Sequence, residues 1–123
     1  MQCEEIIQVF FHMLLNIKLY HWQTLSFARH RASDELHSSL LDLIDSFIEV
    51  YIGRYSRPQF KNAFDIKVKE LDSDSFVDLI KEYIKFLKYK VPKYIKESDT
   101  DLLNIRDEIL SHFNKTLYLC TLN

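Results

Sequence analysis

Two acidic residues one helical turn apart form the first group in this sequence that could bind a cation. Asp45 and Glu49 lie four residues apart in a segment with helical periodicity, so their carboxylates lie one above the other on the same side of a helix. Apolar neighbours occupy that flank, at Leu41, Ile48 and Ile52. Two carboxylates held together beside apolar residues repel each other unless a cation or protons neutralise them. A divalent metal would settle this conflict, although helix periodicity alone favours a pair that faces water or binds lysine or arginine.

Two histidines precede these carboxylates in the sequence. His21 lies on the apolar side of the first helical segment, near its end, and His30 is expected just before the second segment. Imidazole and carboxylate together suit iron, manganese or zinc. A single histidine on an apolar face is more often a hydrogen-bonded core residue than a ligand. The metal hypothesis therefore depends on the combination of groups and not on either histidine alone.

Four segments with helical periodicity would position these groups. They cover roughly residues 4–25, 33–52, 74–90 and 100–121, and both prolines and the single glycine fall between them. One glycine and two prolines leave too few tight turns for an all-β sandwich. The sequence predicts an all-α fold, a four-helix bundle that forms a single domain over residues 1–123.

The helix ends are predicted from capping residues. Ser33 is the expected N-cap of the second helix, and Gly53 is the expected C′ residue after it. Ser73 is expected to cap the third helix, and Ser98 or Asp99 the fourth.

The connection between the second and third helices is long. Residues 53–72 provide about twenty residues, whereas antiparallel neighbours in a bundle need only about 2 to 8. An extended chain of this length can cross a helix of about 30 Å, so the third helix can begin at the end opposite to where the second stops. This long crossover permits a ferritin-like order of helices. Its apolar residues are expected to pack it onto the bundle, with a short helix as one form; they are Phe60, Phe64, Ile66 and Val68.

The first helix has apolar residues on two of its sides. One side is the expected core stripe, while the second would leave a large apolar patch on a monomer. The pattern favours an oligomer that buries the second side, and a crossover that covers it is the alternative. The core stripe comprises Ile6, Phe10, Met13, Leu14, Ile17 and His21; the second side comprises Phe11, Leu15, Leu19 and Trp22; the narrow polar strip comprises Glu5, His12, Asn16 and Gln23.

Composition and charge exclude several classes of function. Sixteen basic and eighteen acidic residues give a formal charge of −2, so no global field attracts nucleic acid or an anionic membrane. Charged residues interrupt every window of the ~20 residues that a membrane helix needs, so no membrane partner is expected. The N-terminus lacks the features of a signal peptide, and Cys3 and Cys120 have no CxxC spacing. We expect free thiols and a cytoplasmic protein.

Two charged groups in the second half of the chain have alternative interpretations. Arg106 falls near the apolar stripe of the fourth helix and needs a carboxylate partner there. Asp107 and Glu108 could ligate an intrasubunit di-metal centre, but the pattern favours a structural ion pair and an acidic cluster at the helix start. The lysine-rich run over residues 81–96 is expected to be the solvated face of an amphipathic helix, so nucleic-acid binding is not expected.

The order of the site residues resembles the ferroxidase signature of Dps-type miniferritins. That signature matches His21-Trp22, His30, Asp45 and Glu49, and the segment HRASDELHSSLLDLIDSFIE aligns with it without a gap, including Asp34. The patterns HWQT, ARH, IDSFIE and DLLNIRDEIL are still more similar to an uncharacterised Dps-like family found largely in phages and large DNA viruses.

This resemblance implies a ferritin-like fold and a site shared across a two-fold dimer. In Dps-type proteins two histidines of one subunit face the carboxylates of its partner, which implies His21 and His30 facing Asp45 and Glu49 of a second chain, with Asp34 as an extra ligand. The implied activity is oxidation of iron, Fe2+ to Fe3+, at a di-iron or mononuclear centre, with zinc or manganese as alternative metals.

The resemblance also implies a homodimer or a larger cage, iron storage, and protection from oxidative stress, in the host cytoplasm or the virion if the protein is viral. The alternative function is a non-enzymatic helical scaffold or virion-associated protein that keeps the fold without ferroxidase activity.

Overall fold

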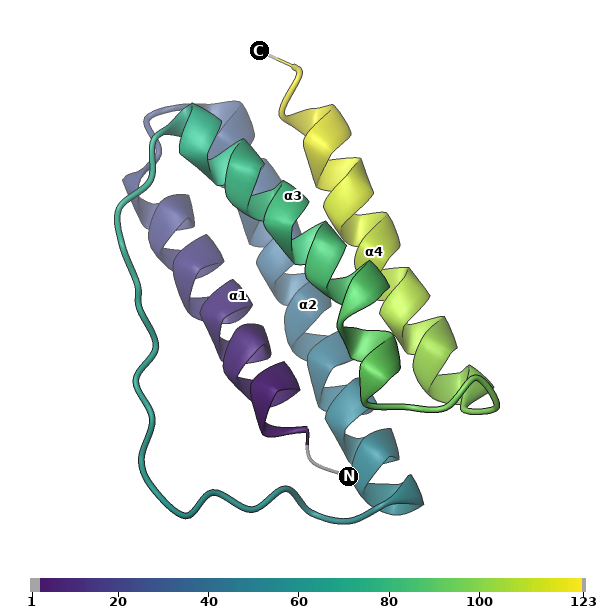
Figure 1. Cartoon of the computed structure of the whole chain (residues 1–123). Helices are drawn as coiled ribbons and strands as arrows, with labels where there is room; N and C mark the ends of the chain where they lie inside the picture. The colour runs from purple at the N-terminus through teal and green to yellow at the C-terminus, as the bar shows by residue number, and fades with distance from the viewer. Residues whose placement is uncertain (1–2, 123) are drawn as a thin grey trace.

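The protein is all-helical. A computed structural model describes residues 3–122, which contain four α-helices and no strand (Figure 1). The elements are α1 (Glu4–Gln23), α2 (Phe27–Arg54), α3 (Ser73–Tyr89), the short 3-10 helix η1 (Val91–Lys93) and α4 (Thr100–Leu119). The prediction of an all-α chain with four helices is confirmed. No helix in this part of the chain is long and apolar enough to cross a membrane.

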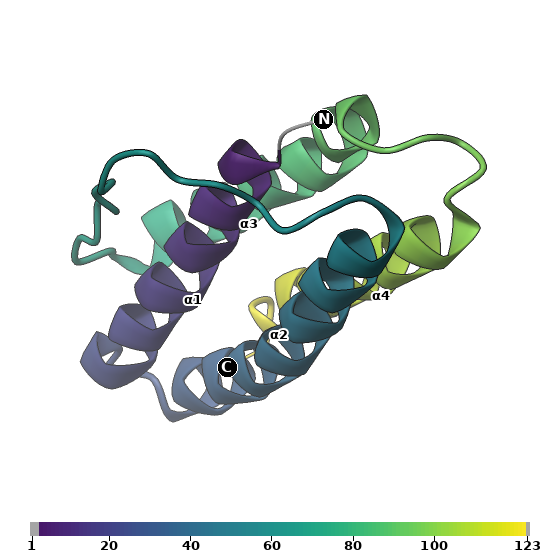
Figure 2. The same ribbon diagram turned by 90° about the horizontal axis from the view of Figure 1, so that it is seen from below.

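The helices form two layers connected by the long crossover. Figure 2 shows α1 and α2 in one layer and α3 and α4 in the other, and α2 also packs against α4. After α2 the chain runs along the outside of α1, from one end of the bundle to the other, before α3 begins (Figure 1). As predicted, α3 starts at the end opposite to where α2 stops. The expected short helix is wrong, because residues 55–72 contain no helix.

Asn16 attaches the crossover to α1. Its Nδ2 donates to the carbonyl of Lys67 at 2.9 Å, and its Oδ1 accepts from the backbone N–H of Lys69 at 3.2 Å. The Asn16 side chain thus makes one donated and one accepted hydrogen bond with the crossover backbone, as the backbone of a neighbouring strand would. Asn16 belongs to the narrow polar strip of α1, but the crossover covers it and leaves it 1% exposed.

The crossover covers only part of the second apolar side of α1. Phe64 stacks on Phe11, with ring centroids 6.1 Å apart, and Phe60 packs on Phe64. Even so, Phe11 stays 44% exposed and Leu15 46% exposed, and Trp22 near the helix end is 67% exposed. An apolar surface therefore remains on α1 in the single chain.

The second helix begins earlier than predicted. Its N-cap is Ser26, whose side chain accepts from the N–H of Arg29 at 3.2 Å. Ser33 is no cap: it is buried inside α2, and its hydroxyl donates to the carbonyl of Arg29 at 2.8 Å. His30 consequently lies within the first turns of α2 and not before it. The early start left no periodic signal, because Phe27 is exposed and Ala32 is the first buried residue of the helix.

Other helix ends also differ from the predicted caps. Gly53 lies inside α2 with no positive φ, so it is not a C′ residue. Asp72 caps α3 in place of Ser73, by accepting from the N–H of Ser75 at 2.8 Å. Asp99 occupies the N-cap position of α4, as one of the two predicted alternatives.

The core follows the predicted helix faces. Phe10 of α1 meets Phe47 of α2 edge to face, with centroids 5.5 Å apart. Tyr20 of α1 stacks on Phe76 of α3 at 3.8 Å, which joins the two layers. Leu14 is half-buried, whereas the other predicted stripe residues of α1 are buried: Ile6, Phe10, Met13, Ile17 and His21.

The charged groups of the C-terminal half are structural and solvent-facing. Arg106 pairs through Nε with Asp107 at 2.8 Å and donates through Nη1 to the carbonyl of Leu87 at 3.1 Å. Asp107 and Glu108 are exposed, as the ion-pair interpretation requires. Both cysteines are free thiols, as expected. The lysines of the 81–96 run are all exposed: Lys81, Lys85, Lys88, Lys90, Lys93 and Lys96.

Replacing Asn16 with leucine should loosen the crossover. The variant loses both hydrogen bonds to the crossover backbone, so we expect the free energy of unfolding to fall by about 1–3 kcal/mol. Trypsin should also cleave faster within residues 55–72. Urea denaturation followed by circular dichroism measures the first effect, and timed proteolysis measures the second. The control is Asn114→Leu at an exposed position of α4; equal losses in both variants would contradict the role of Asn16.

Candidate metal centre

His21 and His30 lie against each other across the turn between α1 and α2. His21 Nδ1 donates to the carbonyl of His30 at 2.8 Å, and His30 Nδ1 donates to the carbonyl of His21 at 2.9 Å. The two rings stack, with centroids 3.9 Å apart and 21° between their planes. A carbonyl oxygen only accepts, so each Nδ1 carries the hydrogen. Both neutral rings then keep a free lone pair on Nε2.

The donation from each Nδ1 to a carbonyl is a feature shared with metal-binding histidines. A ligating histidine usually donates its other ring N–H to a carbonyl or carboxylate, which fixes the tautomer and the ring orientation. Asp34 adds an oxygen ligand, because its Oδ1 lies 3.8 Å from His21 Nε2. One metal ion with ligand distances of about 2.0–2.2 Å can span that separation. Asp34 is exposed and His21 is 8% exposed, so the group opens at the surface.

Asp45 and Glu49 lie far from the histidines of their own chain. They lie one turn apart on α2, as their spacing predicts, but both are exposed in the single chain, as in the water-facing alternative. At 1.5 Å per residue, Asp45 is about 22 Å along the helix from His30. Over residues 3–122, no group of three or more histidine, cysteine, aspartate or glutamate side chains is close enough to hold a metal ion. A single chain therefore brings His21 close to His30 and to Asp34 in two separate pairs, and these do not amount to a group of three ligands.

The two groups share one face of α2. His30, Asp34, Leu41 and Asp45 follow each other at intervals of four, seven and four residues, which keeps them on one side of a helix. Leu41 lies between the two groups and is 46% exposed. The outer face of α2 thus has imidazole near its N-terminal end and carboxylate near its C-terminal end.

His37 is a neighbour of the site that sequence reasoning missed. It is half-buried on α2, and burial together with Lys18 of α1 lowers its pKa, while Asp34 acts in the opposite direction. His21 also contributes to the lowering. The sequence signal for His37 is its spacing of three residues from Asp34, which makes the two side chains neighbours on the surface of a helix.

Arg29 anchors the turn that holds the histidines. Its guanidinium donates to the hydroxyl of Tyr20 at 3.3 Å and to the carbonyls of Ser73 and Cys120 at 3.3 and 3.2 Å. These contacts join α1, the start of α3 and the end of α4 directly beside His30. No local pattern indicates this role of Arg29, because its partners at Ser73 and Cys120 are far away in the chain.

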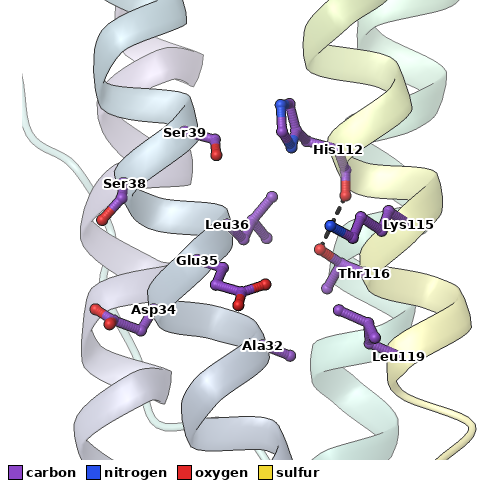
Figure 3. Close-up of a pocket in the computed structure, with 10 residues that line it drawn as sticks. All are labelled: Ala32, Asp34, Glu35, Leu36, Ser38, Ser39, His112, Lys115, Thr116 and Leu119. Atoms are coloured by element: carbon purple, nitrogen blue, oxygen red, sulfur yellow. Dashed lines mark hydrogen bonds between the residues drawn. The ribbon is translucent and has the colours of Figure 1, made fainter.

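The opposite side of α2 has a separate hollow. A depression of about 400 Å³ lies between α2 and α4, and the side chains of Glu35, His112 and Lys115 point into it (Figure 3). Asp34 borders this hollow, but its carboxylate lies near His21 of α1. The histidine pair and the hollow are therefore on different sides of the helix, and His112 is a suitable comparison residue for experiments.

These features define an all-helical protein with an oriented histidine pair and a carboxylate pair on one helix face. The chain matches the model of a family of unknown function, DUF5856, over residues 21–120, and it belongs to that family. It is also similar to the "Uncharacterized 14.6 kDa protein in mobD-ri intergenic region" of Enterobacteria phage T4, with 30% identity over 115 residues, 94% of this chain and 80% of the phage protein. No solved structure matches the chain. The phage relative agrees with the viral part of the resemblance, and the family match includes His21, Asp45 and Glu49.

Long-range 1H–15N NMR should detect the histidine arrangement directly. At about pH 8, above the ordinary histidine pKa of about 6.5, His21 and His30 are expected as Nδ1–H tautomers because both Nδ1 atoms donate to carbonyls. His112 on α4 is the comparison, expected to show the Nε2–H form that dominates in free imidazole. Finding Nε2–H at either His21 or His30 would contradict the reciprocal hydrogen bonds.

Proposed function

We propose that the protein is a Dps-like member of the ferritin-like proteins that binds and oxidises Fe(II) at a site shared by two copies of the chain. The observation that carries this proposal is the separation on α2. An oriented imidazole pair and a carboxylate pair share one exposed face but lie about 22 Å apart in one chain. A second copy would supply to each group the ligands that its own chain holds too far away. The helix order with its long crossover supports the ferritin-like assignment.

A two-fold dimer would complete two sites at once. In a two-fold contact, residue i of one chain meets residue j of the other, and j meets i. Antiparallel packing of α2 on its copy, with His30 level with Asp45 and Glu49 of the partner subunit, places the axis between residues 37 and 40 of α2. Ser38 is exposed at this level, and Leu41 lies one turn further along the same surface.

The surface of α1 and α2 suits such a contact. Leu41, Leu15 and Trp22 are between 46% and 67% exposed, and burying them would remove apolar area from water. The charges are also complementary. The histidine end carries Lys18, Arg29 and Arg31 against Asp34, whereas Asp45 and Glu49 make the other end of the face acidic. Antiparallel packing brings these unlike ends together.

The donor set fits iron as a substrate. Imidazole nitrogen and carboxylate oxygen are ligands that iron accepts, and hard carboxylates favour Fe(III) over Fe(II), which makes loss of an electron easier. With hydrogen peroxide as oxidant, two Fe(II) ions give up one electron each, and peroxide takes both electrons and two protons to form two water molecules. His21 and His30 would orient the iron, Asp34 would add an oxygen, and Asp45 and Glu49 of the partner subunit would stabilise the product charge. Storage of the ferric product would need a closed cage of such dimers.

Absorbance traces of iron oxidation would test the activity. Fe(II) is added without oxygen, peroxide follows, and the ferric absorbance is recorded for the wild type and for Glu49→Gln. The variant loses a charged ligand without losing volume, so we expect the initial rate to fall at least about tenfold. Glu35→Gln is the matched control, because Glu35 lies on α2 but points into the hollow beside α4.

Two outcomes would count against this function. A wild-type trace equal to that of buffer would reject iron oxidation and favour the helical scaffold as the function. A rate lost equally in Glu35→Gln and Glu49→Gln would reject Glu49 as a ligand.

Disulfide trapping would test the dimer separately from the chemistry. The variant Ser38→Cys should form a disulfide between residue 38 of the two subunits under mild oxidation, because this residue lies closest to the inferred axis. Non-reducing electrophoresis detects the linked dimer, and Lys81→Cys on α3 is the exposed control that should stay monomeric. Leu41→Arg should lower the molar mass measured by light scattering. Equal trapping at both positions, or an unchanged mass for Leu41→Arg, would reject this interface.

A further inference from the structure

A second cavity lies where α1, the crossover and α3 meet. We call it the seam cavity; it measures about 490 Å³, and no residue of the proposed iron site lines it. Its walls are largely apolar, with Val9 from α1, Ile66 from the crossover, and Leu79 and Phe86 from α3. A volume of about 300–1,000 Å³ with apolar walls and a few polar groups is typical of small-molecule sites.

One fixed polar group enters this apolar surrounding. His12 lines the seam cavity, and its Nδ1 lies 2.6 Å from the hydroxyl of Tyr83 and 3.3 Å from Nδ2 of Asn16. The two hydrogens of the Asn16 amide reach the carbonyls of His12 and Lys67 at 3.0 and 2.9 Å, so the close partner of Nδ1 is the Tyr83 hydroxyl. With that hydroxyl as the donor, Nδ1 accepts and the neutral ring carries its hydrogen on Nε2. Burial and Lys69 lower the pKa of His12, which keeps the ring neutral near pH 7. His12 therefore has one N–H donor, at Nε2, on a ring that the hydrogen bond with Tyr83 holds in place.

The charges around the seam cavity balance. Asp65 and Glu82 line it together with Lys67, and Lys69 acts on His12 from the same crossover. Two acidic and two basic groups leave no net field that would select an anion or a cation. A site with largely apolar walls, balanced charges, and His12 and Gln8 as neutral polar side chains suits an uncharged ligand.

We propose that the seam cavity binds an uncharged, largely apolar small molecule with a carbonyl or similar acceptor, which the Nε2–H of His12 recognises. The crossover forms one wall, and Asn16 holds this wall in place. The cavity is thus built into the long connection that sets the topology. The site is independent of the iron chemistry, because its residues lie on the other side of α1 from the histidine pair.

The test uses prodan, an uncharged naphthalene with a single ketone, whose emission shifts to shorter wavelength in apolar surroundings. The wild type should bind it saturably at one site per chain. Leu79→Trp fills the seam cavity and should abolish the shift, whereas Leu119→Trp, in the hollow between α2 and α4, should not. Val9→Phe narrows the same cavity from α1 and replaces Leu79→Trp if that variant does not fold, as judged by circular dichroism.

His12→Phe tests the hydrogen bond. Phenylalanine keeps an aromatic ring but removes the donor, and the Tyr83 hydroxyl, freed from Nδ1, can donate instead to the backbone carbonyl of residue 12, which lies 3.2 Å away. We expect binding to weaken about tenfold, the change that one lost hydrogen bond produces. No saturable binding by the wild type, or unchanged binding in both cavity-filling variants, overturns the site. Equal affinity of His12→Phe and wild type overturns the recognition by His12.

Discussion

The rigidity of α2 is the constraint on which the chemistry of this protein depends. Phe27–Arg54 is one helix without a break, so each residue adds about 1.5 Å and no loop can bring its two ends together. The imidazole group at one end and the carboxylate pair at the other therefore stay apart in every single chain. A helix that carries complementary ligands at opposite ends of one face suits antiparallel pairing with a copy of itself. The fold thus ties the proposed chemistry to self-association.

The crossover determines which surfaces remain for that association. It covers one flank of α1 and is held there by Asn16, and the seam cavity lies along this flank, next to the apolar surface that remains exposed. The layer of α1 and α2 keeps exposed apolar residues, among them Leu15, Trp22 and Leu41. A shorter connection would have made α2 and α3 antiparallel and left that flank of α1 open. The topology accordingly provides both the seam cavity, of which the crossover forms one wall, and the exposed apolar surface of α1 and α2.

Sequence periodicity predicted what depends on local spacing. The core stripe of α1 and the placement of Asp45 and Glu49 on one flank of α2 follow from 3.6 residues per turn, and both agree with the structure, whereas the exposure of that flank was not expected. Burial of Asn16 was not predictable, because it depends on backbone atoms about fifty residues away, at Lys67 and Lys69. The start of α2 was missed because the Ser26 cap precedes an exposed phenylalanine and not an apolar stripe.

The histidine pair also combines a feature that the sequence predicts with one that only the fold determines. Its residue types were visible in the sequence, whereas its reciprocal hydrogen bonds depend on a turn of only three residues between α1 and α2. That turn makes the two helices antiparallel and lets each ring reach the other residue's carbonyl. If the partner's carboxylates complete the site, iron binding and dimerisation are linked by a coupling free energy. Whatever strengthens the dimer then tightens iron binding, and iron must stabilise the dimer by the same factor, since linkage between two binding equilibria is reciprocal.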